Sequence, residues 1–146
     1  MPQAPMTGRC FCRAITFEYR GDPNWMLHCH CESCRRATSA PIVTWISVLR
    51  SGFRITKGSP RSYQSSTGVR RSFCGDCGSP LTYVAETIPE EVHILAGTLD
   101  DPSPVRPDRH VFVEDQLPWF EVFDELPRYT TTSRGTKPVR VGPRQR

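Results

Sequence analysis

Short apolar runs separated by turn-forming residues make up most of this chain. The run at residues 41–49 (PIVTWISVL) is rich in β-branched and aromatic residues, which is typical of a buried strand. Clusters of Gly, Pro, Asp and Ser separate it from shorter runs of the same kind. The pattern predicts a mainly β protein, with strands at residues 14–19, 41–49, 53–56, 62–65, 69–73, 81–84, 92–96 and 110–113.

Helix is expected in one place only, at residues 32–38, directly after a cysteine-rich stretch. The chain contains 14 prolines and 10 glycines, which favour turns over long helices. No apolar run approaches the roughly 18 residues of a membrane-spanning helix. The N-terminal residues MPQAPMTGRC also lack the hydrophobic core of a signal peptide. We therefore expect a cytoplasmic protein with no membrane partner.

Charge is unevenly distributed along the 146 residues. Residues 126–146 contain six basic residues and no acidic one, whereas residues 1–125 hold 13 basic and 15 acidic residues. The C-terminal stretch is polar, broken by Pro and Gly, and without periodicity. We expect one domain at residues 1–127, followed by a loose, flexible basic extension at residues 128–146. A nucleic-acid partner is disfavoured, because solvated basic tails without one are common.

The seven cysteines are the strongest chemical signal. They form three close groups, Cys10-x-Cys12, Cys29-x-Cys31-x-x-Cys34 and Cys74-x-x-Cys77. A disulfide framework favours an even count in a secreted chain, and neither condition holds here. Such spacings instead bring sulfurs close enough to share a metal ion at about 2.3 Å per Zn–S bond. Zinc is the expected metal, because it favours sulfur ligands in tetrahedral geometry.

Seven thiols divide naturally into four and three, which predicts two zinc ions per chain. Cys74-Gly-Asp-Cys77-Gly78 is typical of a zinc knuckle, with glycines that let the backbone curl round a metal. Together with Cys10 and Cys12 it would form a closed, structural four-thiolate site. Cys29, Cys31 and Cys34 would then hold a second zinc with a vacant fourth position, which is the layout of a catalytic zinc.

Other arrangements remain open at this level. His28 or His30 could complete the second site and make it structural as well. Against this, His30 lies between two ligands, so its side chain should point away from the metal, and His28 would crowd Cys29. A single shared metal site, with some cysteines as buried thiols, is a further alternative. An iron–sulfur cluster is disfavoured, since no group contains four close cysteines.

Four segments carry a family resemblance when they are taken in order: GRCFC, HCHCESCRR, FCGDCGSPLTY and AGTLDDP. Over residues 7–127 the chain resembles the glutathione-dependent formaldehyde-activating enzymes, and it also resembles centromere protein V. The resemblance implies a zinc-bound β-tent fold. It assigns the structural zinc to Cys10, Cys12, Cys74 and Cys77, and the active-site zinc to Cys29, Cys31 and Cys34.

Two positions depart from the family pattern. The family often has Gly where this chain has Arg13, after the first cysteine pair, and where it has Ser39, shortly after the two arginines. Neither residue is a predicted metal ligand, so both departures leave metal binding intact. Both could reshape a substrate pocket, and the substrate itself is not fixed by family membership.

The resemblance implies a carbon–sulfur lyase that joins glutathione to formaldehyde. A site with three thiolates suits a substrate thiol as the fourth ligand. Arg35 and Arg36 could balance charge and bind a substrate carboxylate, and His30 could shuttle a proton. For His93, His110 and Trp119 we expect packing roles. Alternatives are a zinc hydrolase of another small molecule and a non-catalytic zinc-binding interaction module; the sequence fixes no oligomeric state.

Overall fold

The computed structural model describes residues 3–145 and is mainly β, as the sequence predicts. One α-helix, α1 (Glu32–Thr38), has the predicted bounds. Three short 3₁₀-helices lie at Arg50–Gly52, Ala96–Thr98 and Val113–Asp115. The strands are β1 (Met6–Arg9), β2 (Thr16–Tyr19), β3 (Trp25–Cys29), β4 (Val43–Leu49), β5 (Phe53–Lys57), β6 (Arg61–Ser66), β7 (Val69–Phe73), β8 (Pro80–Ala85), β9 (Glu91–Leu95), β10 (His110–Val111), β11 (Pro127–Arg128) and β12 (Arg140–Val141).

The chain divides into two compact units that each combine distant parts of the sequence. Unit 1 contains the chain up to Trp25 and Ile46–Val105, and unit 2 contains Met26–Trp45 and the chain from Arg106 onward. Strand β4 begins in unit 2 and ends in unit 1, because the division falls between Trp45 and Ile46. Each unit contains one of the two principal cysteine clusters, so each is described separately.

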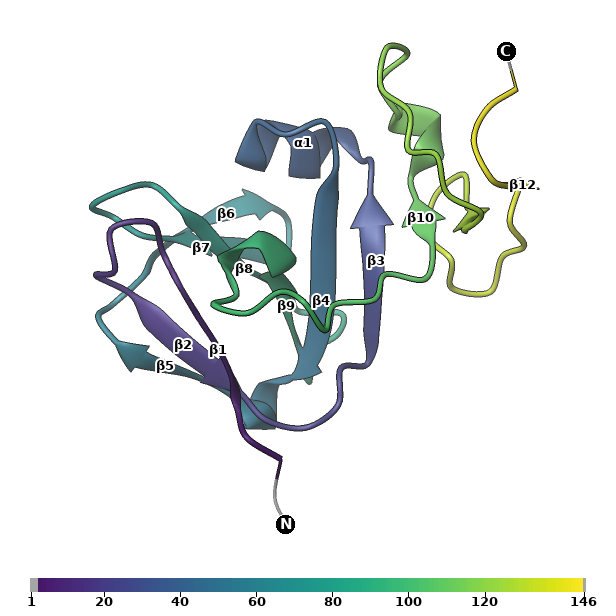
Figure 1. Cartoon of the computed structure of the whole chain (residues 1–146). Coiled ribbons are helices and arrows are strands. Elements are labelled where there is room, and N and C mark those ends of the chain that lie inside the picture. The colour runs from purple at the N-terminus through teal and green to yellow at the C-terminus, as the bar shows by residue number, and fades with distance from the viewer. Residues whose placement is uncertain (1–2, 146) are drawn as a thin grey trace. The chain divides into compact units, whose positions relative to one another are not determined.

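Unit 1 contains two sets of antiparallel strands, of which β1, β2 and β5 can be followed in Figure 1. In the first set β2 lies between β1 and β5, and Tyr19 pairs with both Met6 and Phe53. In the second set β6, β7, β8 and β9 pair in sequence order. Apolar side chains that are almost fully buried form the core of this unit, including Phe17, Leu81 and Ile94.

Unit 2 contains parallel strand pairs, which differ from the antiparallel sheets that the sequence suggests. Strand β10 runs parallel to β3, with His110 opposite His28, and also parallel to β11. Parallel neighbours require a long connection rather than a tight turn. The chain supplies that connection, because about 80 residues separate His28 from His110.

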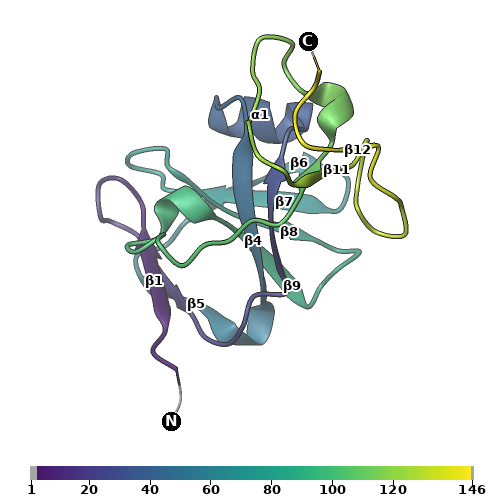
Figure 2. The ribbon, with the colours of Figure 1, turned by 45° about the vertical axis from the view of Figure 1, so that its right-hand side comes forward.

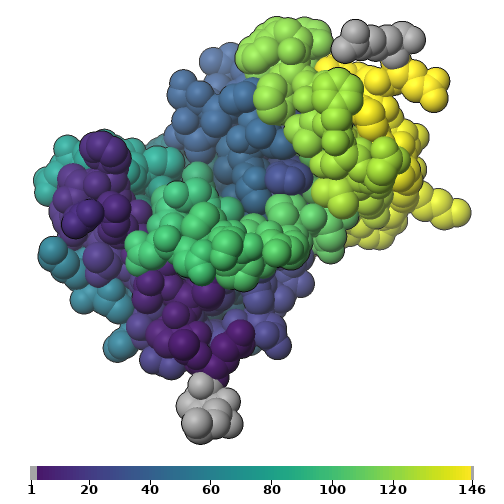
Figure 3. Space-filling view, viewed as in Figure 1, coloured from purple at the N-terminus to yellow at the C-terminus, as the bar shows by residue number. Residues whose placement is uncertain are grey.

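The C-terminal segment, which composition suggests is a loose extension, is folded into unit 2 as far as it is described. Strand β12 pairs with β11, and Arg128 and Arg140 both hydrogen-bond within the unit. Arg144 binds the Glu121 carboxylate at 2.7 Å and the carbonyl oxygens of nearby loop residues. Figures 2 and 3 show this segment, in yellow, against the light-green residues of the same unit. Arg128, Arg140 and Arg144 therefore act as local hydrogen-bond donors, whereas Arg134 and Lys137 are exposed.

None of the helices formed by residues 3–145 is long and apolar enough to span a membrane. The eight predicted strands are all present, with ends shifted by up to two residues in most cases. The sequence pattern missed β1, β3, β11 and β12, of which β3 bears directly on the candidate site.

Candidate functional site

Four cysteine sulfurs lie together in unit 1, from the two segments that the sequence pairs. The group consists of Cys10, Cys12, Cys74 and Cys77, with all Sγ atoms within 4.8 Å of one another. The Sγ atom of Cys12 lies 3.6 Å from that of Cys10 and 3.8 Å from that of Cys74. These thiols are not joined in disulfides. The predicted partners of the closed site thus meet in space.

Backbone turns bring these sulfurs to one point. The Gly78 N–H donates to the Cys74 carbonyl oxygen at 2.8 Å, and Gly78 has a φ of 77°, a left-handed conformation that favours glycine. The Ile15 N–H donates to the Cys10 sulfur at 3.3 Å. The pKa of Cys77 is lowered to about 5, mainly because the Ser79 hydroxyl donates a hydrogen bond to its sulfur. One thiol of this site is thus prepared to ionise.

Three further cysteine sulfurs meet in unit 2, where β3 leads into α1. Cys29 ends β3, Cys31 is the N-cap of α1, and Cys34 lies in the first turn of the helix. The three Sγ atoms lie within 4.8 Å of one another, and those of Cys29 and Cys34 are 3.7 Å apart. The Cys34 N–H donates to the Cys31 sulfur at 3.2 Å, so the helix start helps to fix that ligand.

Both clusters fit a tetrahedral zinc ion. A Zn–S bond of about 2.3 Å places neighbouring sulfurs about 3.8 Å apart, because a tetrahedral edge is about 1.63 times the centre-to-corner distance. The separations of 3.6, 3.8 and 3.7 Å match that value, and the other sulfur pairs of each cluster lie within 4.8 Å. Close contact with two other thiols, and then burial, raise the pKa of Cys29 far above its usual range. A dication would offset this cost, since it favours the thiolates.

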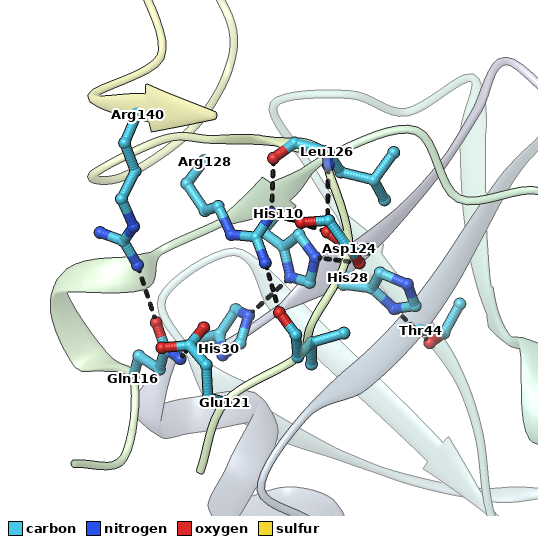
Figure 4. A network of polar contacts seen from close by, with 11 residues as sticks. His28, His30, Thr44, His110, Gln116, Glu121, Asp124, Leu126, Arg128 and Arg140 are labelled. Atoms are coloured by element: carbon cyan, nitrogen blue, oxygen red, sulfur yellow. Dashed lines mark hydrogen bonds and ion pairs between the residues drawn. The ribbon is translucent and has the colours of Figure 1, made fainter. Parts of the chain in front are cut away.

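The histidines of HCHC do not join the three-cysteine cluster. Among residues 3–145 the group at that point contains the three cysteines and no histidine. The Nδ1 atom of His28 lies 2.8 Å from the Thr44 hydroxyl, and the Nε2 atom of His30 lies 2.9 Å from Nδ1 of His110 (Figure 4). Burial is the main cause that lowers the pKa of each of these two histidines to about 4. Both are therefore neutral at pH 7.

A polar network that no sequence pattern identifies is joined to His30 through His110. Nε2 of His110 lies 2.9 Å from Oδ2 of Asp124, and Nη1 of Arg128 donates to the other carboxylate oxygen at 2.6 Å (Figure 4). Burial would raise the pKa of Asp124, but hydrogen bonds from His110, the Leu126 N–H and Arg128 outweigh it and lower the pKa. Asp124 lies in a loop without periodicity, so no pattern identified it.

The two arginines after the cysteines have different surroundings. Arg36 pairs with Glu32 through a 2.8 Å contact between side chains that are 71% and 56% exposed. Arg35 is half-buried, and its Nε atom is buried without a hydrogen-bond partner within the described structure. The Arg35 guanidinium therefore has an unused hydrogen-bond donor, whereas Arg36 is already paired.

The residues expected to pack differ in their placement. His93 and His110 are buried, and His93 hydrogen-bonds to Glu91 at 2.8 Å. Trp119, by contrast, is 73% exposed, so the packing role that the sequence suggests is wrong. It lies in the loop of Pro118–Phe120 that Arg144 binds through carbonyl oxygens, and those bonds use the backbone rather than the indole.

Comparison with known proteins places this geometry in context. A protein of Schizosaccharomyces pombe, named as an uncharacterized lyase, is 23% identical over 123 residues, covering 84% of this chain and 89% of the relative. A crystal structure of a Rhodobacter sphaeroides protein has a TM-score of 0.57 at 24% identity, covering 68% of this chain and 94% of the other. At that identity the second likeness concerns the fold alone.

The decisive match is to a family model. The model described as glutathione-dependent formaldehyde-activating enzyme matches residues 5–115, which include all seven cysteines and both clusters. Together with the lyase name of the yeast relative, it supports a lyase-like function related to glutathione. This chain belongs to the glutathione-dependent formaldehyde-activating enzyme family.

Proposed function

We propose that this protein is a zinc-dependent carbon–sulfur lyase-like enzyme that acts on the adduct of a thiol and a small aldehyde, with glutathione and formaldehyde as the substrates. The observation that carries the proposal is the contrast between the two clusters. One group contains four cysteines and the other contains three, with no further ligand from residues 3–145. A tetrahedral ion held by Cys29, Cys31 and Cys34 would keep one corner for a substrate.

The reaction joins the thiol sulfur to the aldehyde carbon. The S–C bond forms as the carbonyl π pair moves to oxygen, and the proton lost by the thiol ends on that oxygen to give a hemithioacetal. A zinc ion bound by the three cysteines would lower the pKa of the substrate thiol and hold its sulfur in place. In the reverse direction the same S–C bond breaks, which is the lyase reaction.

Arg35 is our candidate for binding a carboxylate of glutathione. It directly follows Cys34, and its buried Nε atom has no hydrogen-bond partner among residues 3–145. A guanidinium can donate two parallel hydrogen bonds to a carboxylate, which fixes direction as well as charge. Arg36 is the weaker candidate, because Glu32 already neutralises it in an exposed pair. We assign no proton transfer to His30, since its Nε2 atom is hydrogen-bonded to His110.

Metal content and turnover test the proposal together. Elemental analysis should give two zinc ions per chain, and adding glutathione should perturb only the site of Cys29, Cys31 and Cys34. Formation of S-hydroxymethylglutathione should exceed the uncatalysed rate in the native protein. Cys31→Ser should abolish that excess, while Ser33→Ala, at an exposed position of the same helix, should retain it. Normal turnover by a folded Cys31→Ser variant would refute the proposal.

The same experiment separates turnover from carriage of the adduct. Binding of glutathione to the native protein without any rate above background would leave a carrier, not an enzyme. Glutathione-independent hydrolysis of an ester or lactone would instead indicate a zinc hydrolase. For nucleic acid, Arg128, Arg140 and Arg144 are already hydrogen-bonded within unit 2, so fewer cations of the C-terminal segment can reach phosphate.

A further inference from the structure

The two histidines of HCHC lie against one common partner. The ring centroids of His28 and His30 are 4.8 and 5.1 Å from that of His110. In an extended chain, alternate side chains point to opposite faces. Cys31 is still extended, with φ −62° and ψ 146°, so the alternation continues to the start of α1. Cysteines and histidines therefore occupy opposite faces of the same segment.

The backbone of this segment is held by the neighbouring strands, including β10. The His28 N–H donates to the Arg109 carbonyl oxygen at 2.9 Å, and the His30 N–H donates to that of Val111 at 3.0 Å. Strand β4 is hydrogen-bonded to the other edge of β3, so the two neighbouring strands set which side chains face which side of the sheet. The histidine contacts add a side-chain constraint to this pairing, because each ring is hydrogen-bonded to a group on another segment.

The direction of the hydrogen bonds from Asp124 to His30 can be worked out. An ionised carboxylate only accepts, so Nε2 of His110 donates to Asp124. Burial lowers the pKa of His110, which favours the neutral imidazole with a single N–H. Nδ1 of His110 then accepts, and Nε2 of His30 donates to it. Nδ1 of His30 then has the lone pair, and it is buried without a partner. Asp124 thereby sets one tautomer in both histidines.

Arg128 holds the carboxylate that begins this series. Its side chain is 1% exposed, and Nη1 donates to Oδ1 of Asp124 and to the Leu126 carbonyl oxygen, both at 2.6 Å. Nη2 donates to the Val122 carbonyl oxygen at 2.7 Å. The same cation argues against a metal ion among His28, His110 and Asp124, although their ligand atoms lie within 4.8 Å, because a dication would face a buried guanidinium.

We propose that His28 and His30 are anchors rather than ligands, and that Thr44, His110 and Asp124 are positioning residues that hold the three cysteines in the geometry of the metal site. This inference deepens the proposed function, on which it rests. Metal sites depend on groups outside the ligand set for their orientation, and loss of such groups typically weakens metal affinity by about 10–100-fold. Here the support passes through the backbone between the ligands.

Asp124→Asn tests the anchor through His30. If the amide oxygen faces Arg128, the amide N–H₂ must face His110, which moves the His110 proton to Nδ1 and reverses the hydrogen bond to His30. Long-range ¹H–¹⁵N NMR spectra of the zinc-loaded chain should report the changed tautomers. Competition with a chromophoric chelator should show about tenfold weaker zinc binding at the three-cysteine site, with the four-cysteine site unchanged.

A second test variant and a control make the inference testable even if Asp124→Asn folds poorly. Thr44→Val removes the hydroxyl that binds His28 but preserves side-chain shape, and should weaken the same site by a smaller factor. His93→Gln alters a buried histidine that binds Glu91 in unit 1, and should leave both zinc affinities unchanged. Equal zinc affinity in native, Asp124→Asn and Thr44→Val chains would overturn the inference.

The outcomes separate this inference from the proposed function. A native chain whose three-cysteine site takes no zinc would refute the proposed function itself. A native chain that binds two zinc ions and loses no affinity in the variants would refute the anchors alone. A third zinc ion lost in Asp124→Asn would show that His110 and Asp124 are ligands, which also overturns the inference.

Discussion

Replacing Arg128 by methionine should destabilise unit 2 by about 3 kcal/mol. The guanidinium is 1% exposed and donates four hydrogen bonds of 2.6–3.1 Å to Asp124, Val122 and Leu126. Removing one partner of a buried ion pair typically costs about 3–5 kcal/mol, because the other charge stays buried without compensation. The Asp124 side chain is 28% exposed, so water can reach it and the lower end of that range applies.

Urea unfolding of the zinc-saturated chain measures this cost. With a slope of about 2 kcal/mol per molar, the midpoint should fall by about 1.5 M relative to the native chain. Arg36→Met is the matched control, because the exposed pair with Glu32 is worth less than about 1 kcal/mol. A loss of unfolding free energy below about 1 kcal/mol for Arg128→Met, or equal losses for both variants, would refute the view that Arg128 holds the loop at residues 122–126.

Three other outcomes follow from single positions. Ser39→Gly and Arg13→Gly should each stabilise the chain by about 0.5–1 kcal/mol in thermal unfolding, because φ values of 57° and 70° strain an L-residue. The greater conformational entropy of glycine in the unfolded chain offsets part of this gain. Burial would raise the pKa of Glu121, but hydrogen bonds from Arg144 and Gln116 outweigh it and lower the pKa from 4.5 to about 2. The resulting stability should be fully present above about pH 4.5 and disappear as the pH falls toward 2. Urea titrations at each pH should show that Arg144→Met abolishes this acid dependence. Cys74→Ser should remove one zinc ion by elemental analysis and lower the melting temperature, whereas retention of two tightly held ions would show that this cysteine is not a ligand.

The two departures from the family pattern illustrate what a sequence can and cannot tell. Arg13 and Ser39 stand where the family often has glycine, and the sequence alone leaves open whether they reshape a substrate pocket. Both residues have positive φ and exposed side chains, and Ser39 is the left-handed C-cap of α1. The glycine preference is thus explained by backbone conformation. The pattern of side chains along the sequence does not reveal the positive φ, because φ is set by the backbone conformation of the folded turn.

Strand prediction succeeded where the side chains alternate, as in β2, or form apolar runs, as in β4. It failed for β3, whose residues WMLHC look like the beginning of a metal motif rather than a strand. It also failed for β11 and β12, which are two residues long and depend on partners far away in sequence. The cysteine groups were predictable because metal chemistry restricts spacing; Asp124 was not, because only tertiary folding brings it to His110.

The failure at β3 and the ambiguity of HCHC have one cause. Composition alone counts five potential ligands between His28 and Cys34, which suggests an overfilled site. A strand assigns alternate residues to opposite faces, so the same letters become two sets with different partners. Cys29 and Cys31 face a shared cluster, while His28 and His30 face His110. A ligand count that ignores the two-residue period of a strand would add a histidine to the metal and leave no coordination position for a substrate. A count made separately on each face of the strand gives three sulfur ligands. It leaves the vacant fourth position on which the proposed chemistry depends.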